Sequence, residues 1–208
     1  MFSELIIGIL ALQGDYEAHA AMLQELGAQT RFVRKPEQLL EIDALVVPGG
    51  ESSTFLKFLE RDGFLEALRR FVHEKPAFGT CAGAILLANE VQNPSQTSLG
   101  AIDIAVARNA YGRQVDSTIR TAETKLEGGP LEMVYIRAPK ITRVGRDVEV
   151  LADRDGDPVL VRGGDIMVAT FHPELTGDTR VHRAFLESVL RHKNGSRETR
   201  ETQASSVK

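Results

Sequence analysis

Residues 5–12 read LIIGILAL, an unbroken apolar run with the length of a strand. A continuous apolar run is typical of a parallel strand covered on both faces, whereas a strand with one wet face alternates apolar and polar residues. The run follows Glu4 rather than a basic segment and ends in Gln13-Gly14-Asp15, so it resembles neither a signal peptide nor a membrane span. We therefore predict a buried strand of a parallel sheet.

Helix and strand patterns alternate after this run. Apolar residues recur at three- and four-residue steps from Ala18 to Leu26, and Gly27 supplies a helix stop. Further short strands are expected at 30–33, 44–47 and 77–78, with helices at 53–60 and 64–73 between the last two. This order predicts an α/β fold with a doubly wound, mostly parallel sheet flanked by helices.

The pattern changes between residues 102 and 168, where short β-rich runs are separated by glycines and charges. The runs lie at 102–106, 117–121, 133–137, 148–152, 159–162 and 166–169. They predict a smaller antiparallel β region beside the main sheet. A helical pattern returns at 178–191, and the polar segment that follows has almost no large apolar residues. We expect one domain over 1–193 and a disordered tail over 194–208.

Composition narrows the class of protein. A chain of 208 residues that is 42% hydrophobic can bury the core of one domain. A net charge of −4 gives no general attraction to nucleic acid or to anionic membranes. The single cysteine excludes an internal disulfide and a cysteine metal site, so we expect no metal and a reducing, cytoplasmic location.

The single cysteine lies in FGTCAGA, residues 78–84, in a Gly-x-Cys-x-Gly pattern between a predicted strand and a predicted helix. The same arrangement with serine is the nucleophile elbow of hydrolases. Gly79 and Gly83 would allow strand and helix to approach closely, while Cys81 adopts a strained backbone conformation at the helix start. The helix dipole there favours a thiolate. The alternative is a buried, inert cysteine, which is the more common state of free cysteines.

A nucleophilic thiol needs a base, and the sequence ATFHPEL at 169–175 offers one. His172 follows a predicted strand, Pro173 stops that strand, and Glu174 is close enough to orient the imidazole. A loop histidine beside a solvated carboxylate is the alternative. The other histidines lie in amphipathic helical stretches, where an exposed or capping role is favoured; they are His19, His73, His182 and His192.

A third turn, in VVPGGESST at 46–54, also follows an apolar strand. The amide of Gly50, together with that of Ala82 after the cysteine, would form an oxyanion hole. The alternative is an ordinary Gly-Gly turn followed by a helix cap at Ser52 or Ser53. Because the carboxyl ends of parallel strands lie at one edge of a sheet, the three turns are expected to meet there.

The motifs PGGESST, FGTCAGA and FHPEL, in this order, resemble those of the triad (class I) glutamine amidotransferases. The segments LALQGDYEAH, ARNAYGRQVDS, YIRAP and FHPELTGDTRVH further resemble the glutaminase subunits of the pyridoxal 5′-phosphate synthase complex. The resemblance covers about residues 6–190. It implies that Cys81 is the nucleophile, His172 the general base and acid, and Glu174 the orienting carboxylate.

The resemblance also implies a set of substrate contacts. Arg108 and Arg137 have ordinary alternatives as solvated loop arginines, and Gln13 as a polar strand end. Gln13 matches a glutamine at the active-site edge, near the surface that meets the synthase. The glutamine-binding positions implied are Gly50, Glu51, Ser52, Arg108, Ile136 and Arg137.

The function implied is hydrolysis of L-glutamine to L-glutamate and ammonia through a Cys81 thioester, without a cofactor. The ammonia would pass to a separate pyridoxal 5′-phosphate synthase subunit in vitamin B6 biosynthesis. Three alternatives are a glutaminase of another pathway, a cysteine hydrolase or stress protein on a related sheet, and a non-enzymatic assembly subunit. ARNAYGRQVDS and IRAP argue against the first, the pairing of PGGES with FHPEL against the second, and the intact triad against the third.

Overall fold

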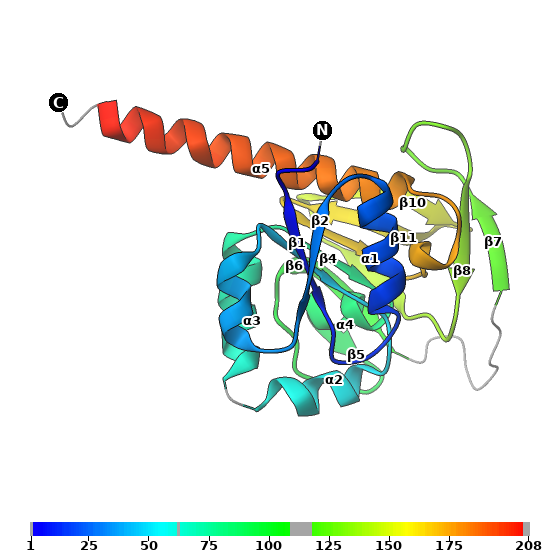
Figure 1. Ribbon diagram of the computed structural model, residues 1–208. Helices are drawn as coiled ribbons and strands as arrows, with labels where there is room; N and C mark the ends of the chain where they lie inside the picture. The colour runs from blue at the N-terminus through cyan, green and yellow to red at the C-terminus, as the bar shows by residue number, and fades with distance from the viewer. Residues whose placement is uncertain (1, 62, 109–117, 206–208) are drawn as a thin grey trace.

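A computed structural model describes residues 2–61, 63–108 and 118–205 (Figure 1). Its main sheet has seven strands in the order β10-β11-β12-β4-β3-β1-β2. The parallel strands are β1 (Ile6–Leu10), β2 (Gln29–Val33), β3 (Ala44–Val47), β4 (Ala77–Thr80) and β12 (Ile166–Ala169). Two antiparallel strands, β11 (Asp157–Gly163) and β10 (Val148–Arg154), extend the sheet beyond β12. The predicted α/β fold class is confirmed.

The strand predicted from residues 5–12 is β1, which pairs with β2 on one side and β3 on the other. Successive strand residues point to opposite faces, and β1 shows the consequence. Ile7 and Ile9 pack into one hydrophobic cluster and Leu10 into the other, and all three side chains are fully buried. Each such side chain contributes about 1.5–3 kcal/mol of burial free energy.

Helices cover both faces of the sheet (Figure 1). On one face lie α1 (Tyr16–Glu25) and α5 (Arg180–Ser205), which supply Leu23 and Phe185 to the cluster that includes Ile7. On the other lie α2 (Ser52–Leu59), α3 (Phe64–Glu74) and α4 (Ala82–Leu87). Two short 3₁₀ turns, η1 (Pro36–Glu41) and η2 (Pro173–Leu175), complete this set. Among the described residues, none of the helices is long and apolar enough to cross a membrane.

The β-rich second half differs from the prediction in its placement. The strands β10 and β11 join the edge of the main sheet instead of lying beside it, and β12 runs parallel to β4. Two small sheets are separate: β5 (Ala88–Gln92) with β6 (Ile102–Ala107) and β9 (Lys140–Val144), and β7 (Thr118–Ala122) with β8 (Leu131–Tyr135). The sequence did not predict β5 or β9, because both carry polar residues and lack a clear alternation.

The C-terminal segment also differs from the prediction. Helix α5 continues to Ser205, whereas a disordered tail was expected from residue 194. Contacts with the N-terminal segment hold the helix at the point where its apolar face ends: Lys193 Nζ lies 2.9 Å from the Glu4 carbonyl oxygen and 3.0 Å from Asp43 Oδ2. Arg197 pairs with the Glu4 carboxylate. A polar composition therefore did not prevent helix formation here.

The predicted close approach of backbone at the Gly-x-Cys-x-Gly turn is confirmed. A methyl group at Gly83 would overlap the carbonyl oxygen of Val47 in β3, and one at Gly79 would lie 2.6 Å from the Gly83 carbonyl group. Helix α4 therefore packs directly on the backbone of the sheet, and only glycine fits at these two contacts.

Substituting Gly83→Ala should lower the free energy of unfolding by about 1–3 kcal/mol, the usual cost of overpacking a closely packed site. Equilibrium urea denaturation measures this change. Gly195→Ala is the matched control, because a methyl group there meets nothing within 4 Å on an exposed part of α5. The control should raise stability by about 0.5–1 kcal/mol. Equal stability of Gly83→Ala and wild type would contradict the packing argument.

Candidate active site

Cys81 connects β4 to α4 in a strained conformation, with φ 49° and ψ −102°. Residues with a side chain rarely adopt this region. The Cys81 amide donates to the Ala169 carbonyl oxygen at 2.9 Å, which ties the turn to the end of β12. The sulfur lies 3.8 Å from the Ile136 carbonyl oxygen, and the residue is 6% exposed. The predicted strained turn is present.

His172 follows β12 and begins η2, so the end of a neighbouring parallel strand brings it to the same sheet edge as Cys81. Its Nδ1 lies 2.7 Å from Glu174 Oε1, and its backbone amide donates to the Val134 carbonyl oxygen at 2.8 Å. The Glu174 side chain is fully buried. The alternative of a loop histidine beside a solvated carboxylate is therefore wrong.

The surroundings of His172 set its charge. Burial lowers its pKa, but interactions with Cys81 and Glu174 outweigh burial and raise the pKa to about 10. The imidazole is thus protonated at neutral pH, with Glu174 against one ring nitrogen. The ring also packs closely on Gly49, where a side chain would collide with its Cε1 atom.

A cavity of about 260 Å³ opens next to Cys81 and His172. Pockets for drug-sized ligands have volumes of about 300–1,000 Å³, so this cavity suits a smaller ligand, such as an amino acid. Residues expected at the site that line it are Gly50, Glu51, Ser52, Cys81, Arg108, Ile136, Arg137 and His172.

Three expected residues lie around this cavity rather than on its wall. Glu174 lies against His172, and Ala82, the second expected oxyanion donor, begins α4 and is 1% exposed. Gln13 Nε2 donates to the Glu51 carbonyl oxygen at 2.5 Å and packs against Gly50, whose φ of +140° favours glycine.

Sequence reasoning missed four residues of the lining. Gly14 and Asp15 follow β1, and Pro139 belongs to the YIRAP segment. Ile85 stands four residues after Cys81, so the helical repeat was the signal that would have placed it near the thiol. Gly14 approaches the Gly49 carbonyl group so closely that a side chain would not fit.

Glu51 caps α2 by accepting from the amides of Ser53 and Thr54, so neither Ser52 nor Ser53 is the cap. The hydrogen bond from the Thr54 side chain, with those from Ser53 and the Thr54 amide, outweighs partial burial and lowers the pKa of Glu51 to about 2. Glu51 is therefore ionised throughout the physiological pH range. Ser52 is buried, and its hydroxyl donates to Gln96 Oε1 at 3.1 Å.

Two arginines line the cavity in different ways. Arg108 is partly buried, and its Nη2 lies 2.8 Å from Ser53 Oγ and 3.8 Å from Glu51 Oε1, so it is not a freely solvated loop residue. Arg137 is exposed and has a positive φ of 46°. Residues 109–117, the rest of the ARNAYGRQVDS segment, lie outside the described residues.

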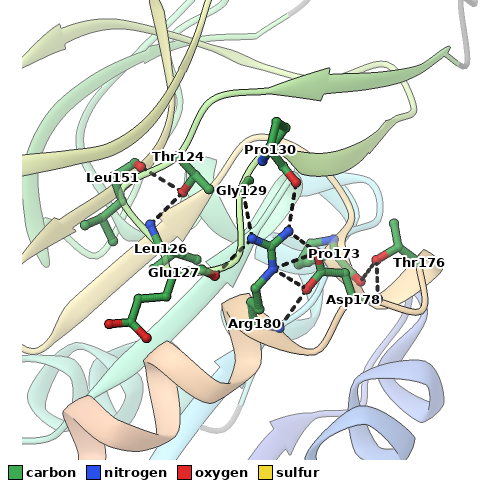
Figure 2. A network of polar contacts seen from close by, with 10 residues as sticks. All are labelled: Thr124, Leu126, Glu127, Gly129, Pro130, Leu151, Pro173, Thr176, Asp178 and Arg180. Atoms are coloured by element: carbon green, nitrogen blue, oxygen red, sulfur yellow. Dashed lines mark hydrogen bonds and ion pairs between the residues drawn. The ribbon is translucent and has the colours of Figure 1, made fainter.

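A polar network anchors the loop that follows η2, the turn that contains Glu174 (Figure 2). Arg180 pairs with Asp178 and donates to three carbonyl groups of the β7–β8 connection. The Asp178 amide donates to Thr176 Oγ1, and that hydroxyl donates to the Pro173 carbonyl oxygen. The network thereby joins α5, the loop after η2 and the hairpin.

The exposed or capping role expected of the other histidines fits His73, which is exposed in the last turn of α3. His192 is partly exposed and pairs with Asp165. The expectation is wrong for His19 and His182, which are fully buried, with His19 Nδ1 2.9 Å from His182 Nε2. His19 is a buried residue of α1 and His182 a buried residue of α5, and the two helices pack on the same side of the sheet.

One group of possible metal ligands occurs among the described residues, formed by Asp15, His172 and Glu174. Their ligand atoms lie within 4.8 Å of one another. Two of the three, His172 and Glu174, are already hydrogen-bonded to each other.

Comparisons with known proteins identify the family of the chain. Residues 9–191 match the SNO glutamine amidotransferase family. The chain is 63% identical over 191 residues to the Pyridoxal 5′-phosphate synthase subunit PdxT of Koribacter versatilis, covering 92% of this chain and 99% of that protein. It is 51% identical to the subunit of the same name from Solibacter usitatus, with 88% and 98% covered. A solved glutamine amidotransferase superposes with a TM-score of 0.81 at 47% identity, covering 88% of this chain and 98% of the other.

Substituting Glu174→Gln should lower the pKa of His172 from about 10, because the neutral amide no longer stabilises the imidazolium. In the wild type, the contribution of His172 to the free energy of unfolding is fully present below the pKa of an unfolded histidine, about 6.5. This contribution is lost as the pH rises through the pKa of His172 in the folded protein. Titration of ¹⁵N-labelled histidines by NMR measures the shift. Glu187→Gln, an exposed change on α5, is the control. An unchanged His172 pKa in Glu174→Gln would contradict the pairing.

Proposed function

Because the chain belongs to the SNO glutamine amidotransferase family, we propose that it hydrolyses L-glutamine to L-glutamate and ammonia at Cys81. One observation carries this proposal: a strained cysteine and His172, which is paired with the buried Glu174, line one small cavity. The relatives named as pyridoxal 5′-phosphate synthase subunits support the same pathway for this chain. The ammonia then serves the synthesis of pyridoxal 5′-phosphate.

The proposed reaction has two steps on one sulfur. The Cys81 thiolate attacks the side-chain amide carbon of glutamine, and the amides of Gly50 and Ala82 stabilise the tetrahedral oxyanion. The carbon–nitrogen bond breaks as His172 donates a proton to the leaving ammonia. The same histidine then takes a proton from water, which cleaves the thioester and releases glutamate.

Charges around the cavity match those of the substrate. Free glutamine carries an ammonium and a carboxylate on its α-carbon, and the cavity offers both an ionised Glu51 and two arginines, Arg108 and Arg137. Ser52 and the backbone at Ile136 complete the proposed glutamine contacts. Arginine suits carboxylate recognition because its planar donors bind both oxygens.

The partner in this proposal is a separate synthase chain that receives the ammonia. Gln13 lies beside Gly50 at the cavity edge and is the residue proposed to lie near that partner surface. Residues 1–193 are proposed to form the single glutaminase domain. A cytoplasmic location remains a prediction from the lone cysteine.

Glutamate release by wild type and by Cys81→Ala, each with and without the pyridoxal 5′-phosphate synthase subunit, tests the proposal. We expect release by wild type that increases with the partner and falls at least about a thousandfold in the variant, as when other covalent nucleophiles are removed. Thermal unfolding of the variant controls for folding. Undiminished release by Cys81→Ala, or no release by wild type with an active synthase, would contradict the proposal.

A further inference from the structure

A buried pair of histidines lies next to Glu174 and has no part in the reaction as described so far. His19 comes from α1 and His182 from α5, and both are fully buried. His19 Nδ1 is 2.9 Å from His182 Nε2. His19 Nε2 is 3.2 Å from Thr80 Oγ1 and 3.4 Å from Glu174 Oε2. One ring thus contacts both the residue before the nucleophile and the carboxylate that orients His172.

The two carboxylate oxygens of Glu174 face different histidines. Oε1 is hydrogen-bonded to His172, whereas Oε2 is buried and has no hydrogen-bond partner among the described residues. A buried carboxylate oxygen without a donor is costly. His19 Nε2 is the ring nitrogen placed to serve Oε2, at a distance slightly longer than a typical hydrogen bond.

Both buried histidines are neutral at physiological pH. Burial lowers the pKa of His19 well below 6.5, and the neighbouring His182 and His172 lower it further. Burial also lowers the pKa of His182 to about 4. Each ring therefore carries one N–H, and the direction of the hydrogen bond between them depends on which nitrogen holds it.

Only one arrangement of these protons suits the surroundings. If His19 carried its proton on Nδ1, the Nε2 lone pair would face the Glu174 carboxylate. His182 would then have to accept through Nε2, which would leave its Nδ1–H buried with no partner. With the proton on Nε2 of both rings, His182 donates to His19, His19 donates toward Glu174 and Thr80, and the unpartnered atom of His182 is a lone pair. The second arrangement leaves no buried N–H without an acceptor.

We propose that His19 is a positioning residue for glutamine hydrolysis, whose Nε2–H holds Glu174 Oε2 while His182 fixes the His19 ring in that tautomer. The inference rests on the proposed function of Cys81, His172 and Glu174. A neutral donor suits this place, because a second cation beside Glu174 would compete with the protonated His172. The groups that face His19 are Thr80 from β4, Glu174 from η2, His182 from α5 and the Phe78 ring.

Two amide substitutions separate the contacts of the two ring nitrogens. Glutamine places its amide group near the position of Nε2, whereas asparagine reaches only the position of Nδ1. We expect His19→Asn to lower kcat for glutamate release about 10- to 100-fold, with KM for glutamine little changed. A loss of this size is typical when the hydrogen-bond partner that orients a metal-ligating histidine is removed. His19→Gln should retain most of the wild-type kcat. Both are assayed with the synthase subunit present.

NMR of the wild-type chain labelled with ¹⁵N-histidine tests the tautomer of each ring and needs no activity assay. Long-range ¹H–¹⁵N correlations should show His19 and His182 neutral and protonated on Nε2 between about pH 6 and about pH 8. A His19 proton on Nδ1, or a charged His19 at pH 7, would overturn the proposal whether or not the variants fold. Wild-type kcat in His19→Asn, or equal losses in both variants, would overturn it too. Failure of wild type to release glutamate would instead count against the proposed function.

Discussion

The turn from β4 into α4 leaves no room for a side chain at Gly79 or Gly83, and the rest of the site is arranged around this turn. Gly83 lies against the Val47 backbone and Gly79 against Gly83, so the helix starts directly on the sheet. Cys81 is held at a positive φ between them. A conformation of this kind costs about 1–3 kcal/mol, and it persists only when surrounding structure fixes it. Here the Cys81 amide is bonded to β12 and the flanking strands are fully buried.

Charge is the second constraint, because the site buries ionisable groups beside the thiol. The imidazolium of His172 and the Glu174 carboxylate are both shielded from water, and each needs partners to offset the loss of hydration. Two histidines of different charge lie against Glu174: the protonated His172 is hydrogen-bonded to Oε1, and the neutral His19 lies 3.4 Å from Oε2. The Arg180–Asp178 network then fixes the loop that follows η2, the turn that contains Glu174 (Figure 2).

The local sequence pattern was enough to predict those elements whose conformation is determined by their own residues. The run at 5–12 specified a strand buried on both faces, and the glycines around Cys81 specified the tight turn. The family resemblance selected Arg108, Ile136 and Arg137, which lie too far from Cys81 in sequence for spacing to group them with it. All three line one cavity with Cys81.

Other features depend on which elements become neighbours, and a single sequence does not show this. The amphipathic pattern favoured an exposed or capping role for His19 and His182, and it did not reveal that α1 and α5 place the two rings in contact. The pattern of β10 and β11 indicated a hairpin without specifying that it joins the edge of the main sheet. The polar end of α5 is held by Glu4 and Asp43, more than 100 residues away in sequence.

The central claim is that Cys81 carries the glutamyl group during hydrolysis. Acid quenching of the complete synthase complex during turnover of isotopically labelled glutamine, followed by peptide mass spectrometry, tests it directly. We predict a γ-glutamyl adduct on the peptide containing Cys81, released by hydroxylamine as a thioester should be. Continuing turnover with no adduct on Cys81, or with the label on a different residue, would contradict it.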